Sequence, residues 1–306
     1  MGYNTNLGFL ILRMVKVSLQ KTHILKHFPS ASALEWVEDK LYVIGDDATT
    51  LLILNNSYQQ LQQIKLFDGA EKRIPKKDKA DLEAATILNI RNTPHLLLIG
   101  SGSKIPERTV IKLLPVQPDV AKSQVQTFSS LQLVEKLQES GLEFVNIEGA
   151  TSTHQAMVLA NRGNLTSPGN TLIFTDHLFW QHECEVTLAK LILPLTGAGV
   201  SGLDYIPETD DLIFTASTEE TANAINDGAI GDSYLGIIKN ISRKYEQAVI
   251  QPDIFINLRK ENAAFHGQKI ESVCVESVKN GLAQLHLCSD NDDGTSVLFK
   301  ITVSLH

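Results

Sequence analysis

The chain has 306 residues, of which 43% are hydrophobic, and its 27 Lys and Arg against 35 Asp and Glu give a net charge of −8. A net acidic chain without basic blocks argues against nucleic-acid binding as its main role. Its apolar runs are shorter than the roughly 18 residues of a transmembrane helix, and three cysteines define no disulfide framework. These features exclude a membrane-spanning protein, a coiled coil, a disordered chain and a small disulfide scaffold.

Short apolar strands, separated by turn residues, account for most of the pattern along the chain. The clearest are residues 40–45, 50–54, 95–100, 109–114, 156–160, 171–175, 211–215, 285–288 and 296–303. One helix is expected at residues 131–139, because Ser130 can cap its start and Gly141 can end it. The chain is therefore predicted to be all-β.

A short phrase recurs five times: an aliphatic residue, then an acid, then a residue that opens an apolar strand. The acids are Glu35, Glu83, Glu148, Asp204 and Glu271. Their spacings of 48, 65, 56 and 67 residues each accommodate four strands with loops, which is one blade of a propeller. We predict a single β-propeller domain over residues 1–306, with four-stranded antiparallel blades. Five blades are counted, and six is the alternative because several spacings exceed a compact blade.

The last repeat lacks its fourth strand. Residues 15–23 can supply that strand beside residues 296–303, which would join the two ends of the chain in one blade. Ring closure by the N-terminal strand is therefore expected.

The propeller topology predicts where the repeated acids meet. An inner strand starts on the face where the second strand of its blade ends, so the five acids are expected to form a ring at one channel mouth. The polar residues expected near this ring are Arg162, Lys104, Arg108, Asp46 and Asp290. Crowded carboxylates must be protonated, paired or bound to a cation.

Three roles for this ring remain open. The acids can be structural, accepting backbone hydrogen bonds from the neighbouring blade. They can hold Ca²⁺ or Mg²⁺, with Glu83, Glu148 and Glu271 as oxygen ligands. The ring can also bind an organic ligand, with Arg162 or Lys104 holding an anionic group.

The inner-strand phrases resemble those of the phytase-like propeller group, which includes the SdiA-regulated type. The phrases are residues 81–84 (DLEA), 146–150 (NIEGA) and 269–272 (KIES), with 289–292 (SDND). The resemblance implies a propeller with an acidic channel suited to calcium. Members of that group are usually six-bladed, so the count of five departs from them.

Two other motifs are discounted. Residues 197–202 (GAGVSG) have the spacing of a dinucleotide-binding loop, but a strand rather than a helix is expected to follow. His177, His182 and Cys184 are spaced too loosely for a convincing zinc site.

Two function classes follow from these observations. The first is a ligand-binding or interaction module that takes a small molecule or protein at the channel face, without nucleic acid or membrane. The second is a hydrolase of phosphate esters that depends on Ca²⁺ or Mg²⁺. The apolar run at residues 7–12 precedes Arg13, whereas a signal peptide places its charge first. A cytoplasmic location is therefore expected, with export through a degenerate or trimmed signal as the alternative.

Overall fold

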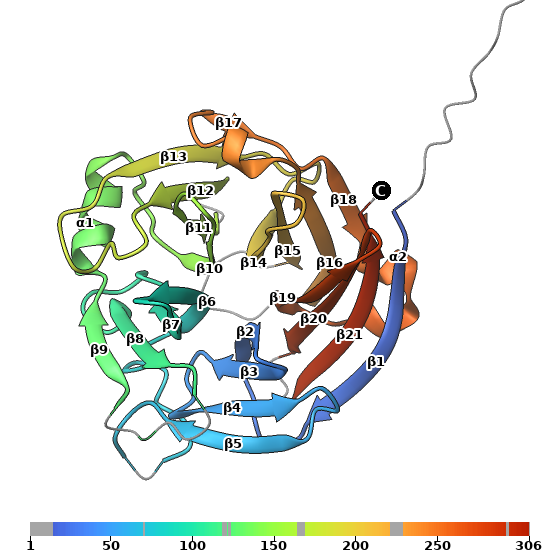
Figure 1. Cartoon of the computed structure of the whole chain (residues 1–306), viewed down its shortest axis with the longest axis horizontal. Helices are drawn as coiled ribbons and strands as arrows, with labels where there is room; N and C mark the ends of the chain where they lie inside the picture. Colours follow the sequence, from blue (N-terminus) through green and yellow to red (C-terminus); the bar gives the residue numbers. More distant parts are fainter. Residues whose placement is uncertain are drawn as a thin grey trace, which may run out of the picture.

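Five antiparallel sheets surround a central channel in the computed structural model, which describes residues 15–69, 71–117, 121, 124–163, 169–220, 229–291 and 294–305 (Figure 1). The sheets are the blades of a five-bladed β-propeller, as predicted, and the alternative of six blades is not met. The apolar run at residues 7–12 lies outside the described residues. Among the described helices, none combines the length and apolar character needed to cross a membrane.

Each blade begins with its innermost strand. The first blade contains β2 (Ala31–Val37), β3 (Lys40–Gly45), β4 (Thr50–Asn55) and β5 (Gln60–Lys65). The second contains β6 (Leu82–Ile90), β7 (Thr93–Gly100), β8 (Val110–Pro115) and β9 (Gln126–Ser129). The third contains β10 (Ile147–Ser152), β11 (Met157–Asn161), β12 (Asn170–Thr175) and β13 (Val186–Leu191). The fourth contains β14 (Ala198–Ile206), β15 (Asp211–Glu220), β16 (Ala229–Ile238) and β18 (Ile254–Asn257).

The fifth blade joins the two ends of the chain. It contains β19 (Ile270–Lys279), β20 (Leu282–Asp290), β21 (Ser296–Ser304) and, outermost, β1 (Val17–Leu25). β1 pairs antiparallel with β21, with Val17 opposite Val303 and Leu25 opposite Ser296. The predicted closure of the ring by the N-terminal strand is confirmed.

The outer strand of the fourth blade differs from expectation. We expect one strand over residues 248–256, but the structure has β17 (Val249–Ile250) and then β18, on different blades. Pro252 lies between them, and proline cannot donate to a strand ladder. β17 consequently pairs parallel with β13, so the third blade has five strands.

The hydrophobic core lies in the interfaces between neighbouring blades. The predicted helix forms as α1 (Leu131–Glu139) and buries Leu133, Val134 and Leu137 in the core cluster shared by the second and third blades. Short helical turns, α2 (Leu258–Glu261), η2 (Ile241–Arg243) and η3 (Ala263–Phe265), occupy connections in the second half of the chain. Cys184, Cys274 and Cys288 are buried free thiols.

A buried charged network joins the first and fifth blades. His286 is fully buried and stacks on Trp36, with ring centroids 4.8 Å apart. Its Nδ1 lies 2.8 Å from the Tyr58 hydroxyl, and its Nε2 lies 2.9 Å from Glu276. The Lys300 ammonium is 2.6 Å from the same Glu276 carboxylate. These ionic contacts hold the pKa of Glu276 at about 2 against the opposing effect of burial.

All five inner strands have a β-bulge at the same place, near their starts. The unpaired residues are Ser32, Glu83, Glu148, Ser201 and Glu271. A bulge leaves one residue outside the ladder and turns its side chain in a new direction. The residue after the bulge is small in every blade, because inner strands converge there: a Cβ on Gly202 would lie 2.7 Å from the Ser272 Cα.

Candidate ligand-binding site

Three glutamates occupy the bulge positions at one mouth of the channel. Glu83, Glu148 and Glu271 are each the unpaired residue of an inner strand, so they share one level of the ring. Serine occupies the same position in the other two blades. The Ser32 hydroxyl donates to the Leu82 carbonyl at 2.6 Å, and the Ser201 hydroxyl donates to the Ile270 carbonyl at 2.6 Å. These serines therefore link adjacent blades through hydrogen bonds, whereas the glutamates place carboxyl groups at the same level of the ring.

Glu35 and Asp204 do not belong to this ring, and the predicted five-acid ring needs correction. Each lies three residues beyond the bulge serine of its strand, opposite Tyr42 and Ile213 respectively. In sequence, Leu34-Glu35 and Leu203-Asp204 resemble the aliphatic-acid pairs of the other three blades. In the strand register, however, Ser32 and Ser201 occupy the positions equivalent to the ring glutamates. The two acids form a second level, further along the inner strands.

Asp204 links three blades from within this second level. Its carboxylate accepts hydrogen bonds from the Val275 N–H at 2.7 Å, the Tyr205 N–H at 2.7 Å and the Thr151 hydroxyl at 3.2 Å. Burial outweighs these donors and raises the pKa of Asp204 to about 6. Burial, with the nearby charge of Asp204, also raises the pKa of Glu35 well above its usual range. Glu35 is buried and the Asp204 oxygens already accept three hydrogen bonds, so this level does not resemble an open ligand site.

Two of the ring glutamates have basic partners. Arg162, from the end of β11, lies 3.6 Å from Glu148, and Asn146 donates to the same carboxylate at 2.6 Å. Burial raises the pKa of Glu148 to about 7 in spite of Arg162. Lys269 lies 3.0 Å from Glu271. From the sequence, Arg162 could either pair with a ring acid or bind an anionic ligand. In the structure it pairs with an acid of its own blade.

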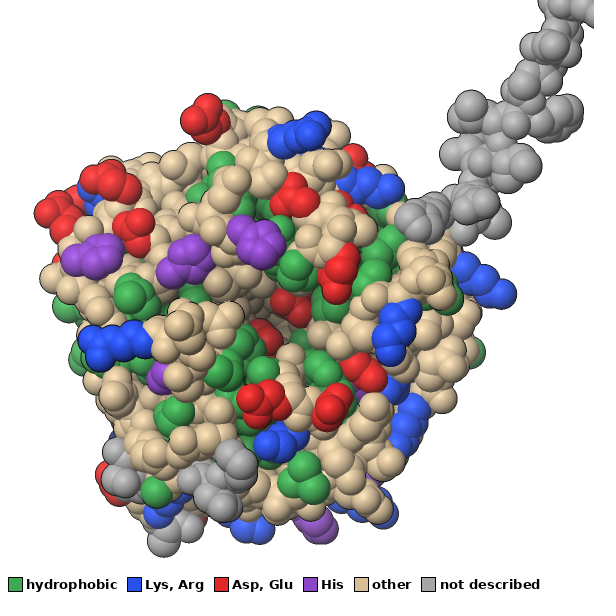
Figure 2. Space-filling view, viewed as in Figure 1, with side chains coloured by type: hydrophobic (Ala, Val, Ile, Leu, Met, Phe, Trp, Pro, Cys, Tyr) green, Lys and Arg blue, Asp and Glu red, His purple; other side chains and the backbone are tan. Residues whose placement is uncertain are grey.

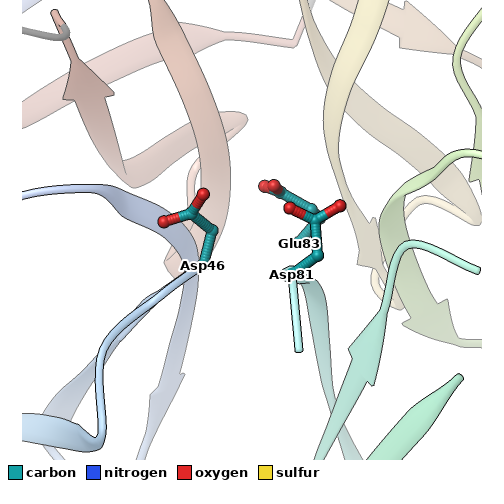
Figure 3. Close-up of side chains that lie close together, drawn as sticks. All are labelled: Asp46, Asp81 and Glu83. Carbon is teal, nitrogen blue, oxygen red and sulfur yellow. The ribbon is translucent and has the colours of Figure 1, made fainter. Parts of the chain in front are cut away.

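A lysine lies among three carboxylates beside the ring. Carboxylate oxygens of Asp46, Asp81 and Glu83 all lie within 4.8 Å of one another (Figure 3). The Lys79 ammonium contacts Asp46 and is 2.6 Å from Asp81. Burial opposes the charge on Lys79, but the surrounding carboxylates outweigh it and raise the pKa of the ammonium. A positive charge from the chain itself thus occupies part of this acidic cluster.

Glu83 is the ring carboxylate without a partner. Within the described part of the chain, it has neither a hydrogen bond nor an ion pair, although it points toward Asp46 from the same side as Asp81 (Figure 3). Burial raises the pKa of Glu83 well above its usual range, and the charges of Asp81, Glu148 and Asp46 add to this effect, whereas the Lys79 ammonium opposes it. One Asp46 oxygen, Oδ1, is also buried without a hydrogen bond. Charge at this corner is therefore incompletely compensated.

The remaining predicted residues lie around the ring. Arg108 is 2.7 Å from Asp81, whose carboxylate also accepts from Ser101 at 2.5 Å. Lys104 lies outside the ring, half-exposed, 3.0 Å from Glu107. Asp290 ends β20 and lies close enough to Arg73 to help raise the pKa of that guanidinium, which pairs mainly with Asp47 at 2.6 Å.

Sequence reasoning did not assign a role to the polar residues that precede the inner strands. Asp81, Asn146 and Lys269 each lie two residues before a ring glutamate, and Lys79 lies two residues before Asp81. A polar residue at this offset in all three glutamate blades was a readable signal. In the serine blades the same offset holds Ser30 and Gly199.

The discounted motifs take structural positions. Residues 197–202 lead into and form part of β14, an inner strand, so no helix follows them. Cys184 is buried, whereas His182 is exposed and contacts the Glu183 carbonyl.

Comparison with known proteins identifies a family and a fold. A family model described as "Family of unknown function (DUF6929)" matches residues 27–303. No curated protein matches the sequence. Among solved structures, glutaminyl cyclase of Myxococcus xanthus is 10% identical with a TM-score of 0.55, over 95% of this chain and 97% of that one.

Two further similar structures are more distant. The allergen Mala s 1 of Malassezia sympodialis is 10% identical, with a TM-score of 0.48 over 93% of this chain and 96% of that one. Virginiamycin B lyase of Staphylococcus aureus is 10% identical, with a TM-score of 0.43 over 94% and 99%. The comparisons support a propeller, as the sequence phrases implied, but not a specifically phytase-like one.

Proposed function

We propose that this chain, which belongs to the DUF6929 family of unknown function, is a binding β-propeller that receives a cationic group at the glutamate ring. The observation that carries the proposal is Glu83, a ring carboxylate without a hydrogen bond or ion pair among the described residues. Glu148 and Glu271 already have basic partners. The Glu83 side chain is only half-buried, so a ligand in the channel can reach it, and groups whose pKa is strongly perturbed cluster at functional sites.

The ligand class follows from the charges around Glu83. An ammonium or guanidinium group of a small molecule, or of a protein side chain, would relieve the repulsion between Glu83 and its acidic neighbours. Arg162 and Arg108 are already paired with acids, so they would bind an anionic part of the ligand only by sharing their donors.

A second candidate is a divalent cation, with hydrolysis of a phosphate ester as its consequence. The oxygens of Asp46, Asp81 and Glu83 within 4.8 Å of one another suit Ca²⁺ or Mg²⁺, which prefer oxygen ligands. The Lys79 ammonium contacts two of the three acids, so a metal ion would have to displace it. This competition favours the organic cation over the metal.

Thermal melting tests both candidates in one series. Wild type, Glu83→Gln and the exposed control Glu143→Gln are melted with Ca²⁺, with Mg²⁺, and with ethanolamine and agmatine as organic cations. A ligand at 100 times its Kd stabilises the folded state by about 2.7 kcal/mol. We expect stabilisation of wild type and the control by an organic cation, and its loss in Glu83→Gln.

Lys79→Met separates the metal from the organic cation. Removing the ammonium leaves the three carboxylates open, so stabilisation by Ca²⁺ that appears or strengthens in this variant would support the metal site. If no cation stabilises any variant, the proposed binding function is wrong. In that case Glu83→Gln should still melt higher than wild type, because it removes an unpaired carboxylate.

A further inference from the structure

A large cavity opens on the face of the propeller opposite the glutamate ring. Its volume is about 1020 Å³. The ring lies where inner strands begin, whereas this cavity lies where β6, β10 and β14 end and the chain turns back. Its walls are the β6–β7 turn, the β10–β11 turn and the connection from β12 to β13. The second and third blades thus supply most of it, and no residue of the glutamate ring contributes.

The lining of this cavity contains basic side chains without acids. Arg91, His95, His154 and His177 line it, and neither Asp nor Glu is among the described residues that do. Figure 2 shows histidines gathered beside the central hollow, over the blade of β10–β13. This is unusual in a chain with a net charge of −8. Three acids neighbour the lining without being part of it: Asp210 accepts the Tyr205 hydroxyl, Asp204 accepts the Tyr205 N–H, and Asp176 is exposed beside His177.

Several hydrogen-bond donors of the cavity are free to meet a ligand. Arg91 has no ion pair or hydrogen bond within the described structure, and the His154 imidazole has no hydrogen bond there either. His95 uses Nδ1 on the Thr93 carbonyl and keeps Nε2 available. A guanidinium with no carboxylate partner, set among imidazoles, is suited to a carboxylate or phosphate group.

The backbone around these donors is well held. Arg91 and Asn92 both have positive φ, 52° and 63°, which forms a tight two-residue turn between β6 and β7. Thr153 is fixed by Tyr245 at 2.5 Å, and its carbonyl contacts the His177 Nε2 at 2.9 Å. The His154 ring packs against the edge of Tyr205 at 5.7 Å. The backbone that carries Arg91 and His154 is therefore well held, and both side chains are exposed to solvent.

Apolar side chains complete the lining. Leu88 and Leu113, which are almost fully buried, lie on the inner side of the cavity, with Ile90 and Leu178 beside them. Cavities of this size that combine an apolar surface with a few convergent polar groups are typical of small-molecule sites.

We infer that this cavity is a second binding site, specific for a small organic anion. Arg91 and the histidine edges hold its carboxylate or phosphate group, and its apolar part lies on Ile90 and Leu178, which are partly exposed. The site is independent of the glutamate ring, and the two faces of the propeller select ligands of opposite charge.

Fluorine NMR of matched fragments tests this inference. The anionic probes are 4-fluorobenzoate and 4-fluorophenyl phosphate, and their neutral counterparts are 4-fluorobenzamide and 4-fluorophenol. We expect line broadening of an anionic probe that exceeds that of its neutral counterpart. Arg91→Gln should weaken that binding about 10-fold or more, the usual consequence of losing a charged hydrogen-bond donor.

Three variants serve as controls. Arg91→Lys keeps the charge and should retain most of the binding. Arg259→Gln removes the same charge from α2, where Arg259 is half-exposed and pairs with Asp232, and should leave binding unchanged. Glu83→Gln should also leave it unchanged, because that residue lies at the other face. Equal binding of anionic and neutral probes, no binding of either anion, or equal loss in Arg91→Gln and Arg259→Gln would each overturn the inference.

Discussion

Asp204 provides a sharp test of the two-level description of the channel. Its carboxylate accepts three hydrogen bonds from donors on three blades, yet its pKa is raised to about 6. A group whose pKa is higher in the folded state contributes most stability below its unfolded value of 3.8. That contribution is lost as the pH rises through 6. The difference of about 2.2 pKa units corresponds to roughly 3 kcal/mol.

The substitution to test is Asp204→Asn. The amide keeps one acceptor, but its NH₂ faces either the Val275 N–H or the Tyr205 N–H, and an unsatisfied buried donor costs about 1–3 kcal/mol. Near pH 4, where wild-type Asp204 is largely protonated, the variant should therefore be less stable by about that amount. At pH 7 the wild type also carries the buried charge, which the variant lacks. Between pH 4 and pH 7 the difference should shift in favour of the variant by roughly 2.4 kcal/mol, so that it vanishes or reverses.

Urea unfolding of both proteins at pH 4 and pH 7 measures this change. Asp39→Asn is the control, because Asp39 is exposed in the β2–β3 turn and should change stability by no more than about 0.5 kcal/mol. A destabilisation that is equal at both pH values, or larger at pH 7, would refute the reasoning. It would mean that the three donors stabilise the charged carboxylate more than burial opposes it.

Three further outcomes are expected. Glu276→Gln should cost about 3–5 kcal/mol in urea unfolding, because it leaves the Lys300 ammonium buried without its ion pair; Glu276→Gln with Lys300→Met should recover part of that loss, and no recovery would argue against the pair. Gly202→Ala should cost about 1–3 kcal/mol by overpacking, whereas Ala84→Gly, at the matching position of the second blade, should cost about 1 kcal/mol or less. Cys184, Cys274 and Cys288 should react with a disulfide reagent such as DTNB only after unfolding, since all three are buried; rapid labelling of the native protein would contradict this placement.

The strands, the blade count and the ring closure could be predicted because each depends on local pattern and chain arithmetic. Apolar runs with turn residues mark strands, and a missing fourth strand after residue 271 points to the other end of the chain. The split of β17 from β18 was also readable, since Pro252 interrupts that segment.

The candidate site was only partly predictable. Glu83, Glu148 and Glu271 occupy the bulge position of their strands. Glu35 and Asp204 also follow an aliphatic residue, but they lie three positions after the bulge residue of their strands. A sequence phrase does not show which residue leaves the ladder, because the bulge depends on contacts with the next blade. The Lys79 contacts depend in the same way on Asp46 from the first blade and Asp81 before the second.

The pairing of β1 with β21 has a consequence for how the protein is made. Val17 and Val303 are neighbours in the fold, but 286 residues separate them in the chain. At a ribosomal speed of about 5–20 residues per second, β1 waits roughly 15–60 s before its partner is synthesised. Throughout that time it is an unpaired strand, able to associate with other nascent chains. Polar side chains alternate along this strand, among them Ser18, Gln20 and Thr22. They keep the segment soluble until β21 has been synthesised.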